Sequence, residues 1–80
     1  MNQPVEQLDV RAHVCPMTYV YTKLRLEALR PGELLEVLVR GEAPLRNIPR
    51  SAREEGHVVL KTEPMENDCH RILIEKKERT

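Results

Sequence analysis

Cys15 and the proline that follows it have residue types and a spacing that suit thiol chemistry. Proline is favoured at the first position of an α-helix, because its missing N–H would have no partner there, so Cys15 is predicted to take the N-cap position. The unpaired N–H groups and the positive end of the helix dipole stabilise a thiolate over a thiol. Arg11 and His13 precede Cys15 in the same segment and would add positive charge. We therefore expect the pKa of Cys15 to be lowered and its thiolate to be nucleophilic.

Both cysteines also have plainer interpretations. A lone cysteine near a helix start can be a small apolar side chain at the junction of a helix and a sheet. Cys69 has no proline after it and no predicted helix behind it, so a structural or incidental role is favoured for it. A resolving role, in which Cys69 closes a disulfide with Cys15, requires that their Cα atoms lie within about 7 Å. The first residues, MNQPVEQLDV, show neither a basic start nor an apolar stretch, so we expect the reducing cytoplasm and two free thiols.

Metal and cofactor chemistry is not predicted. Four residues could be arranged as zinc ligands: His13, Cys15, Cys69 and His70. Their spacing contains neither Cys-x-x-Cys nor the paired histidines of structural zinc sites. His57 is interpreted as a loop residue. The sequence offers no acid–base pair, so a hydrolase, a metalloenzyme and a bound cofactor are not expected.

The size and composition of the chain argue against further classes of protein. The chain has 80 residues, the size of one compact domain over residues 1–80. The 13 basic and 13 acidic residues cancel, so direct binding to nucleic acid is not expected. No apolar run approaches the roughly 20 residues of a membrane span, so a membrane location is not expected either.

The hydrophobic pattern predicts the elements that must position Cys15. Leu8 and Val10 alternate with charged residues, which predicts a strand near residues 6–11. An amphipathic helix is predicted from Pro16 to Arg30. The apolar face of this helix is expected to comprise Met17, Val20, Tyr21, Leu24 and Ala28.

The hydrophobic pattern also predicts strands and helix in the rest of the chain. Residues 33–39 predict a strand, and residues 43–55 predict helix, with Pro49 opening a second helical piece and Gly56 ending it. Two further strands, one starting at residue 58 and one over 71–76, are expected to form a hairpin. The order β-α-β-α-β-β predicts an α/β fold, a two-layer α/β sandwich with two helices on one face of a four-stranded mixed sheet.

The motifs together resemble those of the TusA-like (SirA-like) sulfur-carrier family. The stretch LDVRAHVCPMTYVYTKLRLEALRPGELLEVLV is similar to that family's strand ending in Asp-x-Arg, followed by Cys-Pro, a helix, Pro-Gly-Glu and a strand. Ala43-Pro44 and Asn47-Ile48-Pro49 resemble its later turns, so the likeness runs from Leu8 to Glu75. Three positions depart from the family pattern: Ala12 replaces a glycine, Thr18 replaces the second proline of Cys-Pro-x-Pro, and Asn47 replaces an aspartate.

The resemblance implies a sulfur carrier, at most a sulfurtransferase, that accepts persulfide sulfur on Cys15 and relays it to a partner protein in tRNA thiolation, cofactor sulfuration or sulfur oxidation. The implied partners are a sulfur-donor protein, either a cysteine desulfurase or a rhodanese-like protein, and a sulfur-acceptor protein. Asp9, Arg11 and Pro16 match family positions that shape the loop. The alternative is a non-enzymatic redox-regulatory or protein-interaction module with the same fold, which the threonine at position 18 favours.

Overall fold

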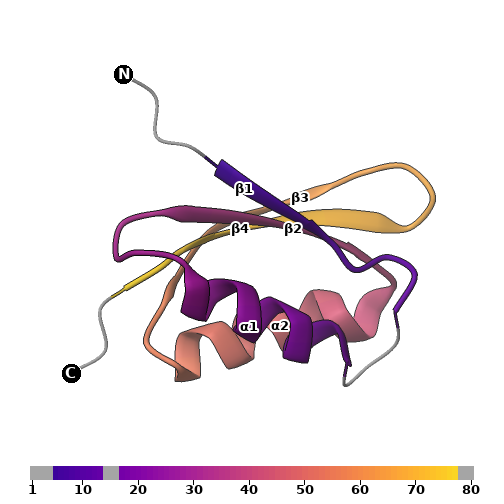
Figure 1. The fold of residues 1–80 in the computed structure, drawn as a ribbon. Helices are drawn as coiled ribbons and strands as arrows, with labels where there is room; N and C mark the ends of the chain where they lie inside the picture. Colours follow the sequence, from indigo (N-terminus) through magenta and orange to yellow (C-terminus); the bar gives the residue numbers. More distant parts are fainter. Residues whose placement is uncertain (1–4, 14–16, 78–80) are drawn as a thin grey trace.

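The computed structural model describes residues 5–13 and 17–77, which form a four-stranded sheet and two helices (Figure 1). The elements in chain order are β1 (Val5–Asp9), α1 (Met17–Ala28), β2 (Leu34–Arg40), α2 (Glu42–Glu54), β3 (Val58–Pro64) and β4 (Cys69–Glu75). None of the helices in this part of the chain is long and apolar enough to cross a membrane.

The sheet has the strand order β1-β2-β4-β3. β1 and β2 are parallel, with Asp9 opposite Leu38, whereas β4 is antiparallel to both of its neighbours. Parallel strands need a crossover connection, and α1 supplies it between β1 and β2. Both helices lie on the same face of the sheet (Figure 1). The fold class predicted from the sequence is therefore confirmed.

The ends of the strands follow local turn chemistry. β1 ends at Asp9, two residues before the predicted boundary, because Arg11 and Ala12 are in a turn. The predicted hairpin of β3 and β4 is confirmed, and its turn contains Asn67 and Asp68 at φ angles of 61° and 60°. Asparagine and aspartate are the side chains that best tolerate this left-handed backbone.

α1 turns a different face to the core from the one that its periodicity predicts. Its buried residues are Thr18, Thr22 and Leu26. All five residues of the predicted apolar face are instead exposed: Met17, Val20, Tyr21, Leu24 and Ala28. The hydroxyl of Thr22 donates to the carbonyl of Thr18 at 2.8 Å, so this buried polar group is satisfied within the helix. The predicted buried face is wrong because a threonine that bonds its own helix can be buried like an apolar residue.

α2 is one continuous helix, and the predicted break at Pro49 is wrong. Proline lacks an N–H group and so removes one hydrogen bond from a helix interior. Ile48 and Ala52 are fully buried in the core on either side of it, and this packing holds the helix together. Gly56, with φ of 95°, follows the helix end as predicted, and its N–H donates to the carbonyl of Arg53 at 3.0 Å.

Candidate functional site

The described part of the candidate site is a hydrogen-bonded turn that follows β1. The carboxylate of Asp9 accepts three hydrogen bonds from Arg11, from Nε at 2.9 Å, from Nη2 at 2.7 Å and from the backbone N–H at 3.0 Å. The N–H of His13 donates to the carbonyl of Val10 at 3.0 Å and closes a turn over residues 10–13. Asp9 and Arg11, two of the predicted supporting residues, are therefore in direct contact.

This pair is an ion pair that does not titrate near neutral pH. The hydrogen bond from the Arg11 side chain, followed by that from its backbone N–H, lowers the pKa of Asp9 to about 2. The Asp9 carboxylate in turn raises the pKa of Arg11. Both groups keep their charge wherever a thiol titrates, so they orient the turn and do not act as acid or base.

Ala12 fits the turn although the related family pattern has glycine there. Among the described residues, positive φ angles outside glycine occur only at Asn67 and Asp68. Ala12 therefore needs no left-handed conformation, and its methyl group costs no backbone strain. This departure from the family pattern leaves the turn before Cys15 intact.

Cys15 and Pro16 lie outside the described residues, and the prediction that Cys15 caps α1 stays a prediction. The next described residue is Met17, where α1 begins. His13, before this interval, lies against Tyr21 of α1, with ring centroids 4.6 Å apart and an interplanar angle of 43°. The turn after β1 and the first turns of α1 are thus in contact at one end of the molecule (Figure 1).

Cys69 opens β4 at the same end as the β1 turn. It is only 2% exposed, its thiol is free, and its Sγ–H donates to the carbonyl of Asn67 at 3.4 Å. Arg11, whose pKa is raised mainly by Asp9, also interacts with the Cys69 sulfur. Burial and hydrogen bonding fit the structural role expected for Cys69.

The histidines and carboxylates of the described ranges do not gather into a metal site. No group of three or more His, Cys, Asp or Glu side chains in 5–13 and 17–77 could hold a metal ion. His57 is buried, and its Nδ1 accepts a hydrogen bond from the backbone N–H of Lys77 at 3.2 Å. His57 thus ties the C-terminal segment to the end of α2.

A shallow depression of about 440 Å³ lies beside the turn and is lined by Asp9, Arg11, Ala12 and Arg40. Arg40 is the last residue of β2 and lies opposite Cys69 in the sheet register. The sequence gives no local signal for Arg40, because only the register of β1, β2 and β4 brings it beside Arg11. The depression places two guanidinium groups next to the segment that leads to Cys15.

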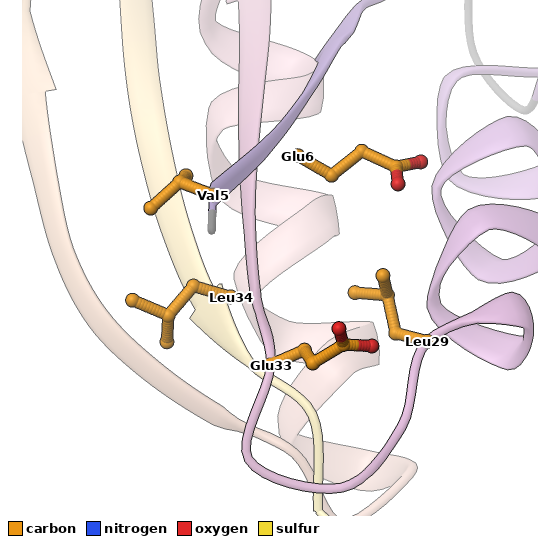
Figure 2. A pocket seen from close by; sticks show the side chains of 5 residues that line it. All are labelled: Val5, Glu6, Leu29, Glu33 and Leu34. Atoms are coloured by element: carbon orange, nitrogen blue, oxygen red, sulfur yellow. The ribbon is translucent and has the colours of Figure 1, made fainter. Parts of the chain in front are cut away.

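A second depression, of about 280 Å³, lies where β1 and β2 begin and carries no thiol. Figure 2 shows Val5 and Leu34 on one side of this strand pair, and Glu6 and Glu33 on the other with Leu29. The Glu6 carboxylate pairs with Arg25, and that of Glu33 accepts a hydrogen bond from the Arg30 N–H at 2.6 Å. These contacts stabilise the end of α1, and we assign the pocket no chemistry.

The fold has a solved counterpart in the crystal structure of the SirA-like protein from Desulfitobacterium hafniense. The TM-score is 0.79 at 22% sequence identity, and the match covers 94% of this chain and 100% of that one. The fold is therefore that of a SirA-like α/β protein. Residues 6–76 match the family described as Sulfurtransferase TusA, and the chain belongs to this family.

Relatives from distant organisms agree with this assignment. A protein of Archaeoglobus fulgidus named as a candidate sulfur carrier is 46% identical over 72 residues, which are 90% of this chain and 82% of that protein. A candidate sulfur carrier of Thermotoga maritima is 37% identical over 94% of this chain and 95% of its own length. The YedF protein of Escherichia coli, also named as a candidate sulfur carrier, is 34% identical over 91% of this chain and 94% of its own length.

Proposed function

We propose that this protein is a sulfur carrier that holds a persulfide on Cys15 and relays its outer sulfur between two partner proteins. The observation that carries the proposal is the Asp9–Arg11 turn, which leads directly into the Cys15-Pro16 pair of a TusA-family chain. The partners are a sulfur-donor protein, such as a cysteine desulfurase or a rhodanese, and a sulfur acceptor.

The loading step needs no oxidant or reductant. The Cys15 thiolate attacks the outer sulfur of the donor's cysteine persulfide, a new S–S bond forms at Cys15, and the S–S bond of the donor breaks. The donor cysteine leaves as a thiolate, and the proton of the transferred sulfhydryl stays with the transferred sulfur. Discharge repeats this exchange with a cysteine of the acceptor as the attacking thiolate.

The surroundings of Cys15 in the sequence support this chemistry. Exchange at sulfur depends on the thiolate fraction, the pKa of the leaving thiol and access, and it requires neither a general base nor an oxyanion hole. The charge of Arg11 is balanced by the ionised Asp9 carboxylate, so we expect the start of the helix, rather than Arg11, to favour the Cys15 thiolate. Pro16 preserves the helix-start signal, so replacement of the family's second proline by Thr18 leaves the thiol chemistry possible.

The test is sulfur uptake by two single-cysteine variants. A persulfide donor carrying radioactive sulfur should label the Cys69→Ser variant as fully as the wild type, because Cys69 is buried. The Cys15→Ser variant should stay unlabelled. Labelling lost only in the Cys69 variant would show that the wrong thiol has been assigned.

The redox-regulatory alternative makes a different prediction for the same samples. Under mild oxidation it requires a disulfide between Cys15 and Cys69 and no stable added sulfur. Cys69 would have to leave its buried position and its bond to the Asn67 carbonyl to react. We therefore expect the reduced protein to gain sulfur before it forms an internal disulfide.

A further inference from the structure

A groove runs between α2 and the hairpin of β3 and β4, and we call it the α2–β3 groove. Its volume of about 510 Å³ is larger than that of either depression described above. None of its lining residues belongs to the turn after β1. The polar and proline side chains that line it are Arg46, Pro49 and Arg53 of α2, Thr62 and Pro64 of β3, and His70 of β4.

The helix side of the groove is a row of residues with helical spacing. Arg46, Pro49 and Arg53 are three and four positions apart, so they lie on one side of α2. The two arginines are two turns apart, about 10 Å along the helix axis. The buried ring of Pro49 lies between them. The wall of the groove is therefore apolar at its centre and cationic towards both ends.

The sheet side of the groove is a part of β3 and β4 that the helices leave uncovered. Thr62 lies opposite Ile72 in the register, and Ile72 is buried in the core, so both side chains are on the face that carries the helices. Pro64, two residues on, shares this face and lies opposite His70. Thr62 and Pro64 are nevertheless exposed. The groove thus has room for a further element beside α2.

The charge of the groove is positive, although the whole chain is neutral with 13 basic and 13 acidic residues. None of the described residues that line it is acidic. Arg46 pairs with Glu42, so its charge is compensated, but its other N–H groups can still donate. Within 5–13 and 17–77, Arg53 forms no ion pair. Glu63 alternates to the opposite face of β3, where it pairs with Arg71.

His70 adds a hydrogen-bond donor to this surface. In the described part of the chain its Nδ1 is buried and has no hydrogen-bond partner. A neutral ring with its proton on Nε2 avoids burying an N–H group without an acceptor, and it leaves Nε2–H as the donor of the ring. With the Thr62 hydroxyl and the two guanidinium groups, the groove offers four side chains that can donate hydrogen bonds and no carboxylate to accept them.

The shape of the groove indicates which class of occupant fits. Sites for small molecules bury most of the ligand, whereas this groove is open to solvent, so it suits a segment of a macromolecule better. Its described lining holds no aromatic ring except the His70 imidazole, and the chain has no net positive charge, so nucleic acid is disfavoured. Carboxylates match the fork of N–H groups on arginine, and apolar side chains between them would pack on the two prolines.

We propose that the α2–β3 groove binds a short acidic segment of a partner protein, with carboxylates on Arg46 and Arg53 and an apolar side chain between them. This inference goes beyond the proposed function and does not depend on it, because no lining residue belongs to the segment that carries Cys15.

The experiment measures binding of a fluorescein-labelled peptide of alternating glutamate and valine, by fluorescence anisotropy at about 0.15 M salt, where the Debye length is about 8 Å. We expect this peptide to bind and the same peptide with lysine for glutamate not to bind. Arg53→Glu should raise the Kd at least about tenfold. Arg50→Glu makes the same change of charge on α2 outside the groove lining, so it is the matched control and should change the Kd less than about twofold.

A second variant tests the groove without changing α2. Thr62→Glu places a carboxylate on the exposed sheet side, so it should weaken binding of the glutamate peptide as Arg53→Glu does. Backbone amide shifts in nitrogen-15 NMR should change on addition of the peptide around Arg53, Thr62 and His70. The same spectra show that each variant is folded.

Several results would overturn the assignment. If Arg50→Glu weakens binding as much as Arg53→Glu, or if the amide shifts map to another surface, the groove is not the site. If an RNA oligonucleotide of equal charge binds the groove more tightly, or if the wild type forms a dimer in sedimentation that Arg53→Glu dissociates, the occupant is nucleic acid or a second copy. Sulfur uptake from glutathione persulfide should be the same in Arg53→Glu and in the wild type, and a wild type that takes up no sulfur would contradict only the proposed function.

Discussion

At the scale of single residues, Asp9 and Arg11 define the turn that leads to Cys15. Arg11 donates three hydrogen bonds to the Asp9 carboxylate, two from its side chain and one from its backbone N–H. These bonds fix both the side chain and the backbone of Arg11. Such charge-assisted pairs are stronger and more directional than neutral hydrogen bonds. The two residues are partly exposed, so their contribution is to the shape of the turn more than to stability.

The lowered pKa of Asp9 predicts how this turn responds to acid. A carboxyl group whose pKa is lower in the folded state stabilises the fold above its unfolded pKa, and that contribution is lost as the pH falls towards the folded pKa of about 2. The difference in unfolding free energy between the wild type and Asp9→Asn should therefore be constant near neutral pH and shrink between about pH 4 and about pH 2. Urea unfolding at a series of pH values measures it. A difference that does not change with pH would contradict the assigned ion pair.

The two cysteines should differ in reactivity. Cys15 is predicted to have a lowered pKa, so it should react with iodoacetamide at lower pH than an ordinary thiol. Cys69 is buried and should be alkylated slowly until the protein unfolds. Mass spectrometry of the labelled peptides across pH, in folded and urea-unfolded protein, measures both. Equal labelling of the two cysteines in the folded protein, and only at alkaline pH, would rule out an activated Cys15.

At the scale of elements, α1 shows what a periodic pattern can and cannot predict. The apolar residues at positions 17, 20, 21 and 24 correctly predict a helix, since they recur with its period. They do not predict which face is buried, because Thr18 and Thr22 with Leu26 form the inner face. The Thr22 hydroxyl bonds within its own helix, so hydropathy alone misjudges its tendency to be buried.

Two leucines of α1 provide a matched test of this orientation. Leu26→Ala should lower the free energy of unfolding by about 2–5 kcal/mol, because it leaves a cavity in the core. Leu24→Ala should change it by less than about 0.5 kcal/mol, because the side chain is mostly exposed. Denaturant unfolding of both variants measures this contrast. A larger loss for Leu24→Ala would mean that the buried face is the one predicted from periodicity.

At the scale of the whole molecule, the order and type of the elements could be predicted from the sequence. Alternation in β1, the aliphatic run of β2 and the turn residues Asn67 and Asp68 are local signals. The proximity of Arg11, Arg40 and Cys69 could not be predicted, because it depends on the register between three strands that are distant in the sequence. Sequence reasoning thus proposes Cys15 as the reactive residue by its motif, and the fold adds the residues that lie beside the turn after β1.

The small size of the chain also bears on mechanism. One face of the sheet is covered by helices, the other carries paired charges, and the depressions beside the β1 turn and at the start of β1 and β2 are open to the surface. Such a protein suits stoichiometric transport of one atom, with the chemistry at each end of the transfer supplied by partners.

The most direct measurement of the central claim is the intact mass of the reduced protein after incubation with a persulfide donor. We predict that one sulfur atom, about 32 Da, is added, that peptide mapping places it on Cys15, and that dithiothreitol releases it as sulfide. A suitable acceptor protein should discharge the same species. A protein that gains no sulfur from any persulfide donor, and shows only a disulfide between Cys15 and Cys69, would contradict the carrier function.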